Sequence, residues 1–180
     1  MGIVKLTEEM KRELMDSYVR GLGLEPKHLS KEEAEKEIID FLNKHNTCVL
    51  ATCGKDGKPR STVVDYENDG MTVYIVTEGG GKIDNILENP NVSLGIYVPH
   101  KTMKGVMGLN YQGKAEIFTM EDKEEMSKIL PLFREVMENF KKEVKNITPR
   151  PEIMKVIKIT PERVVFICYG RGIAEAVWTK

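Results

Sequence analysis

Cysteine, histidine and tryptophan are scarce in this sequence, which has three Cys, three His and one Trp among 180 residues. An odd cysteine count does not predict a disulfide framework, and Cys48 and Cys53 would point to opposite faces of one strand. The histidines are scattered and no Cys-x-x-Cys motif occurs, so we predict no metal site. No Ser/His/Asp or Cys/His arrangement can be recognised, and no catalytic residue is assigned.

Long apolar runs and an excess of either charge are also missing. No run approaches the roughly 20 apolar residues that a membrane-spanning helix needs, and residues 1–10 are polar rather than signal-like. The 27 basic and 28 acidic side chains create no dominant field, which argues against nucleic acid as the main partner. We therefore expect a cytoplasmic protein that binds neither membrane nor nucleic acid.

The length and composition predict a single domain over residues 1–180, with 41% hydrophobic residues available for its core. Residues 7–21 and 31–44 have the apolar spacing of helices, so residues 1–30 are predicted to form a helical extension before the main fold. Ser30 and Glu33 have the spacing of a capping box, which marks the start of the second helix.

From residue 47 onward the pattern changes to strands separated by turn residues. The predicted strands are 47–53, 60–67, 71–77, 92–98, 106–118, 153–159 and 163–169, followed by a tail over 170–180. Tight turns at 54–58 and at Asp69-Gly70 predict a meander of the first three strands. A short helix is expected at 82–89, and a helical stretch at 121–144 that Pro131 splits. Together these elements predict a mainly β fold in which an antiparallel sheet of about six strands curls or closes, with helices outside it.

The segment from Thr77 to Lys82 joins a strand to a helix through three consecutive glycines. Unpaired N–H groups at a helix start carry about half a positive charge, and Lys82 adds a full one, so the segment suits an anion such as phosphate. Arg60 begins a strand that the meander places beside Thr77, and its guanidinium can bind phosphate with two hydrogen bonds. The alternative is an ordinary solvated glycine loop, and the spacing is not that of a P-loop.

Several segments, in order and at similar spacing over about residues 38–120, resemble the pyridoxamine 5'-phosphate oxidase-like, FMN-binding split-barrel superfamily. They are Lys58-Pro59-Arg60-Ser61-Thr62-Val63-Val64, Tyr74-Ile75-Val76-Thr77 with Lys82, Asn89-Pro90-Asn91-Val92-Ser93-Leu94 and Gln112-Gly113-Lys114-Ala115-Glu116. The resemblance implies a six-stranded antiparallel split β-barrel with flanking α-helices over residues 31–180. It also implies a homodimer that holds FMN, flavin mononucleotide, between its protomers.

The same resemblance implies which residues would contact the cofactor. Arg60, Thr77 and Lys82 match positions that hold the phosphate, with Val76 beside them. The backbone of Ser61, Thr62, Val63 and Val64 would run along the flavin ring. Gly81 stands where the oxidases have an arginine, and Gln112 is expected to replace a glutamine that they carry where this chain has Gly108.

The function expected from this resemblance is an FMN-binding oxidoreductase that passes electrons from a reduced nicotinamide or flavin donor to a small acceptor. Two alternatives stay open: a flavin-binding or storage protein without turnover, and the same fold with haem or the deazaflavin F420 as ligand. The tail lacks the tryptophan and arginine pattern of the true oxidases, so oxidation of pyridoxamine phosphate is not predicted. Trp178 and Arg171 are left as either packing or cofactor-covering residues.

Overall fold

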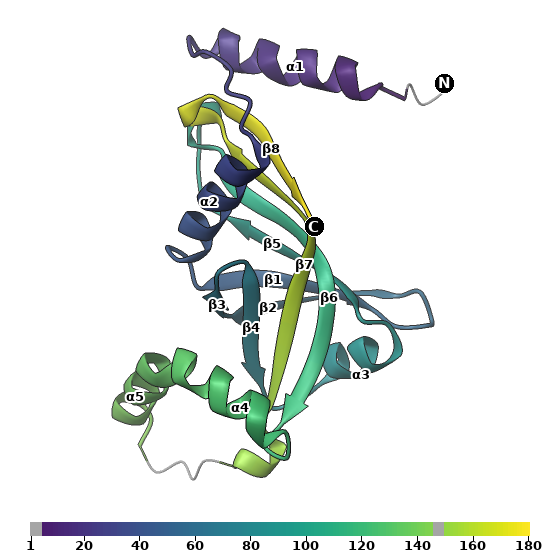
Figure 1. Cartoon of the computed structure of the whole chain (residues 1–180), viewed down its shortest axis with the longest axis vertical. Helices are drawn as coiled ribbons and strands as arrows, with labels where there is room; N and C mark the ends of the chain where they lie inside the picture. Colours follow the sequence, from purple (N-terminus) through teal and green to yellow (C-terminus); the bar gives the residue numbers. More distant parts are fainter. Residues whose placement is uncertain (1–4, 146–149) are drawn as a thin grey trace.

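The computed structural model describes residues 5–145 and 150–180 and is mainly β, with one antiparallel sheet of eight strands and helices outside it (Figure 1). The strands are β1 (Thr47–Cys53), β2 (Pro59–Asp65), β3 (Glu67–Asp69), β4 (Thr72–Thr77), β5 (Asn91–Tyr97), β6 (Met107–Thr119), β7 (Lys155–Cys168) and β8 (Ile173–Thr179). The α-helices are α1 (Glu8–Gly21), α2 (Lys31–Leu42), α3 (Gly81–Glu88), α4 (Lys123–Ile129) and α5 (Arg134–Glu143). The short 3₁₀ helices are η1 (Met103–Gly105), η2 (Leu130–Phe133), η3 (Pro151–Ile153) and η4 (Tyr169–Arg171).

The sheet follows the order β2-β1-β5-β6-β7-β4-β3, and β8 pairs with β7. The two longest strands, β6 and β7, lie side by side; β4 pairs with the first part of β7 and β8 with its second part. Only Tyr66 separates β2 from β3, although these strands stand at opposite ends of the path. The sheet therefore curls round, which confirms a split-barrel fold with eight strands rather than six.

The predicted meander is wrong. Within the described residues β2 pairs with β1 alone, whereas β4 pairs with β3 and β7. Tyr66 is the cause: its N–H donates to the carbonyl of Asn46, 2.7 Å away, and its buried ring turns into the core. After Tyr66 the chain leaves β1 and forms the short strand β3, which pairs with β4 across the turn at Asp69-Gly70.

Two other strand predictions need correction. Most of the segments 153–159 and 163–169 belongs to one strand, β7, which continues through Pro161 and bulges at Glu162, the residue without a register partner between Gly113 and Gln112. The tail is not irregular, because β8 pairs antiparallel with the second part of β7. Alternation in Ala174-Glu175-Ala176 is a weak signal because alanine has little preference for strands.

The helices agree more closely with the sequence patterns. In α2 the predicted capping box is present: Glu33 N–H donates to Ser30 Oγ at 3.2 Å, and Ser30 N–H donates to Glu33 Oε2 at 2.8 Å. The stretch predicted at 121–144 consists of α4 and α5, and the 3₁₀ turn η2 containing Pro131 separates them. Figure 1 shows α1 beyond one end of the sheet, and α4 and α5 at the other end.

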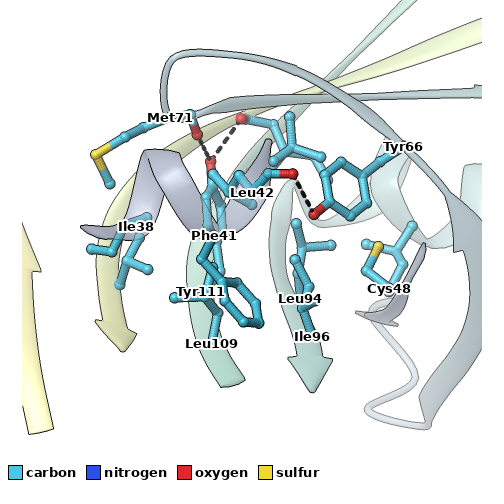
Figure 2. Packing of buried hydrophobic residues seen from close by; sticks show 14 of the residues in the cluster. Ile38, Phe41, Leu42, Cys48, Tyr66, Met71, Leu94, Ile96, Leu109 and Tyr111 are labelled. Atoms are coloured by element: carbon cyan, nitrogen blue, oxygen red, sulfur yellow. Dashed lines mark hydrogen bonds between the residues drawn. The ribbon is translucent and has the colours of Figure 1, made fainter. Parts of the chain in front are cut away.

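The core lies inside the curled sheet and under α2 (Figure 2). Tyr111 on β6 is fully buried, and the carbonyls of Met71 and Ile159 share its single hydroxyl proton, each 2.9 Å from the phenol oxygen. Tyr66 donates its hydroxyl to the carbonyl of Leu42 at 3.1 Å, which ties the end of α2 to the sheet. Burial raises the pKa of both phenols, so they stay neutral hydrogen-bond donors.

The cysteines are free thiols, with Cys48 and Cys168 buried. Residues 5–145 and 150–180 contain no group of three or more His, Cys, Asp or Glu side chains that is placed to hold a metal ion. In the same part of the chain, no helix has the length and apolar character to cross a membrane.

Candidate anion-binding site

The glycine run between β4 and α3 forms the rim of a shallow, open hollow. Its lining residues are Thr77, Glu78, Gly79, Gly80, Lys82 and Ile153. Gly79 and Gly80 have φ angles of 141° and 92°, which side-chain-bearing residues rarely adopt, so this turn requires glycine at both positions. Sequence reasoning missed Ile153, since it is remote in the chain and carries no polar group to mark it.

Arg60 reaches this site from β2. A Cβ atom built on Gly81 would lie only 2.7 Å from Cζ and Nη2 of Arg60, so the guanidinium rests directly against the first residue of α3. The predicted proximity of Arg60 to the glycine run is therefore present, although the predicted pairing of β2 with β4 is not. The curl of the sheet brings them together instead.

Contacts between α3 and the β1–β2 hairpin fix this arrangement. Arg60 is the register partner of Thr52 on β1, so the two side chains share a face of the sheet. Thr52 is buried and its Oγ1 lies 3.1 Å from Nδ2 of Asn85 on α3, which donates to it. At the far end of α3, Glu88 accepts a hydrogen bond of 2.8 Å from the N–H of Lys55. The helix start is thereby held next to Arg60.

Thr77 and Lys82 meet at the backbone of Gly79. The N–H of Gly79 donates to Thr77 Oγ1 at 3.3 Å, and Lys82 Nζ donates to the Gly79 carbonyl at 2.8 Å. Gly80, the N-cap of α3, supplies no side-chain acceptor for the N–H groups of the first turn. Their partial charge and the two cations make this end of α3 positive, which favours an anion.

The predicted ring-binding segment lies on an edge strand. Among the described strands β2 has a neighbour on one side only, so backbone N–H and C=O groups along its other side are available to a planar polar ligand. Ser61 and Val63 point outward, and the Val63 side chain is 71% exposed. Thr62 and Val64 point inward, and Val64 packs against the core.

Two predicted site residues lie away from the hollow. The Val76 side chain packs into the apolar cluster against α4 and η2 and so points away from the hollow, although Thr77 next to it lines the hollow. Gln112 is exposed on β6 and shares a register row with Ser93, Ala51 and Ser61. Three strand spacings, about 14 Å, separate it from Ser61 within this chain.

The two tail residues left open by the sequence are engaged in packing. Trp178 Nε1 donates to Glu35 of α2 at 2.8 Å, and its ring packs against the core. Arg171 makes a double hydrogen bond to Glu37, with Nη1 2.6 Å from Oε2. Both side chains clamp the C-terminal segment onto α2 and lie outside the anion site.

Solved structures of other proteins have the same fold, and the names of three of them mention three different ligands. An FAD-binding protein of Mesorhizobium loti is 20% identical, with a TM-score of 0.56 over 77% of this chain and 94% of that one. A heme binding protein of Mycobacterium smegmatis is 18% identical, with a TM-score of 0.61 over 85% of this chain and 59% of that one. An F420 reductase is 20% identical, with a TM-score of 0.52 over 69% of this chain and 93% of that one.

At these sequence identities the similarity shows a shared fold only. The search of curated proteins found no match. The sequence does match a family model, that of pyridoxamine 5'-phosphate oxidase, over residues 34–168. This match runs from α2 to the end of β7 and so includes β2, the glycine run and α3. The chain belongs to the pyridoxamine 5'-phosphate oxidase family.

Proposed function

We propose that this chain is a cytoplasmic, FMN-binding oxidoreductase that moves electrons from a reduced nicotinamide or flavin donor to a small acceptor. The observation that carries the proposal is the guanidinium of Arg60 resting against Gly81, next to Lys82 and the uncapped start of α3. Two cations and a helix start without a side-chain cap match the phosphate end of FMN in charge and hydrogen bonding.

The rest of the site fits the other parts of FMN. The free side of β2 along Ser61–Val64 offers backbone donors and acceptors for the polar edge of the ring. FMN supplies the redox chemistry when bound, which is consistent with the absence of a recognisable catalytic triad. The protein's own groups then bind the phosphate, orient the ring and shield one side of it from water.

The proposal includes a homodimer. The outer face of β2, β1, β5 and β6 carries Val63 and Tyr97, which are 71% and 67% exposed. Exposed apolar residues on the outer face of a sheet favour burial against another protein surface. Gln112 lies on this face too, so a second protomer there would bring it to the seam. Size-exclusion chromatography with light scattering tests the dimer, and a monomer at micromolar concentration contradicts it.

Spectroscopy of untreated purified protein tests FMN binding. We expect flavin absorbance bands, and excess FMN at about 100 times Kd adds about 2.7 kcal/mol to the free energy of unfolding. A colourless protein whose melting temperature does not change with FMN refutes the proposal. Mass spectrometry of any released ligand distinguishes FMN from haem and F420.

A flavin-binding protein without turnover is the second candidate. The observation that favours it is the engagement of Trp178 and Arg171 with glutamates of α2, which occupies the two tail side chains that were candidates for covering the cofactor. Anaerobic stopped-flow mixing with NADH or NADPH separates the candidates. Prompt flavin reduction supports the enzyme, and a flavin that stays oxidised supports the binding protein.

A further inference from the structure

We infer that Lys155 is a third cation of the anion-binding site and adapts it to the terminal, dianionic phosphate of a phosphate monoester. The inference deepens the proposed function and rests on it. It concerns a residue outside the segments that pointed to the site, since Lys155 begins β7, 73 positions after Lys82 in the chain.

The strand register brings Lys155 to the hollow. Lys155 is directly opposite Thr77 in the antiparallel pair of β4 and β7, and these strands end together near the glycine run (Figure 1). Side chains of directly opposed residues leave the same face with Cβ atoms about 4.5–5.5 Å apart. Lys155 Nζ lies 3.3 Å from the carbonyl of Ile153, and Ile153 lines the hollow. A lysine stem is long enough to swing its ammonium group from that carbonyl toward Thr77.

The charges around the hollow favour an anion. Arg60, Lys82 and Lys155 come from β2, α3 and β7, and none of them forms an ion pair with a carboxylate in the described part of the chain. Glu78 and Asp84 are exposed carboxylates near the glycine run. On the β6 side, Thr119 is the register partner of Lys155, and Asp122 accepts hydrogen bonds from the N–H and hydroxyl of Thr119. Lys155 and Lys82 are partly buried and donate only to backbone carbonyls. A partly buried ammonium without a counter-charge is poorly compensated, and an anion in the hollow would supply that charge.

The number of cations indicates which phosphate the hollow prefers. A phosphate monoester carries about 1.5 to 2 negative charges at pH 7, while each phosphate of a diester or pyrophosphate linkage carries about one. Lys82 lines the hollow, Arg60 lies against Gly81 next to it, and Lys155 is opposite Thr77. Three cations that can turn toward one anion gain more from the monoester. Lys155 also supplies a cation to a site in which Gly81 stands where the oxidases carry an arginine. The site should therefore prefer FMN over FAD, and over riboflavin, which has no phosphate.

Ligand titrations of the full-length protein test this inference. Lys155→Met keeps the apolar stem and removes the charge, Lys155→Gln is the second neutral variant, and Lys155→Arg restores a cation. Lys158→Gln is the matched control, because Lys158 lies three residues further along β7 on the other face and is 3.8 Å from Glu125. Flavin fluorescence gives the dissociation constants for FMN, FAD and riboflavin, and thermal melting shows which variants are folded.

We expect both neutral variants to bind FMN roughly tenfold more weakly while binding riboflavin as the wild type does. Lys155→Arg and Lys158→Gln should keep the wild-type preference for FMN. Equal loss of FMN and riboflavin affinity, or no loss of either, overturns the role of Lys155 while leaving FMN binding intact. Failure of the wild type to bind FMN overturns the proposed function, and the inference with it.

Discussion

Replacing Gly81 with alanine should change the stability of the protein and its affinity for FMN in opposite directions, so the variant tests phosphate binding independently of folding. The new Cβ would lie 2.7 Å from Cζ and 2.8 Å from Nε of Arg60. Non-bonded carbon atoms approach favourably only to about 3.5 Å, so the guanidinium must move by close to 1 Å. Arg60 is exposed, and its guanidinium makes no hydrogen bond to the described residues, so this movement costs the folded protein little.

The two effects of Gly81→Ala have opposite signs. Alanine is favoured over glycine in a helix by up to about 1 kcal/mol, so the free energy of unfolding should stay the same or rise. A charge-assisted hydrogen bond contributes about 1.5–3 kcal/mol. Displacing Arg60 should therefore reduce the free energy of FMN binding by an amount near the lower end of this range. We therefore expect FMN affinity to fall about tenfold, which corresponds to about 1.4 kcal/mol.

Fluorescence titration with FMN and urea unfolding measure the two effects. Gly21→Ala is the matched control, because Gly21 is the last residue of α1 and no described atom would lie within 4 Å of its new Cβ. The control should alter stability in the same direction and leave FMN affinity unchanged. If Gly81→Ala binds FMN as tightly as the wild type, Arg60 does not hold the phosphate and the site has been assigned wrongly.

Three further predictions follow from single contacts. Lys82→Ala removes a cation at the start of α3 and should weaken FMN binding roughly 10- to 100-fold in the same titration; unchanged affinity would mean that the phosphate lies elsewhere. Tyr111→Phe leaves two buried carbonyls without their hydroxyl donor and should lower the free energy of unfolding by about 1–3 kcal/mol in urea, without changing FMN affinity. Burial, aided by the charge of Asp65, raises the pKa of Cys48 from 9.0 to about 12. Folding thus favours the neutral thiol, so its stabilising effect is present below pH 9 and is lost as the pH rises toward 12. Urea unfolding at pH 8 and pH 10.5 should show a smaller alkaline loss of stability for Cys48→Ala than for the wild type, and equal losses would contradict the assignment.

Much of the candidate site was predictable because its features are local. The run of three glycines after a strand, followed by Lys82 and an apolar helical spacing, predicts a strand, a turn and a helix start, and the structure contains all three. Arg60 lies next to the glycine run, as predicted, but for a different reason from the one predicted. Neighbouring strands in sequence often pair, and here Tyr66 diverts the chain so that the curl of the sheet makes the contact.

Residues contributed by remote strands were not predictable in the same way. Ile153 lines the hollow, and Lys155 is opposite Thr77, because β7 pairs with β4 in one particular register. Gln112 belongs to a strand that matches the family, yet its register row places it three strands from Ser61. A shift of one residue in either pairing would reverse which face these side chains occupy.

The amino-acid sequence alone determined the nature of the elements: mainly strands, a capped helix before them, a glycine turn that only glycine can form, and a cation at the next helix. These follow from backbone conformation and from the spacing of apolar residues, which act over a few positions. The tertiary structure alone decided which strands pair, how the sheet curls, and which cations meet at one hollow. Those choices depend on contacts between segments far apart in the chain, and the local pattern is compatible with several pairings.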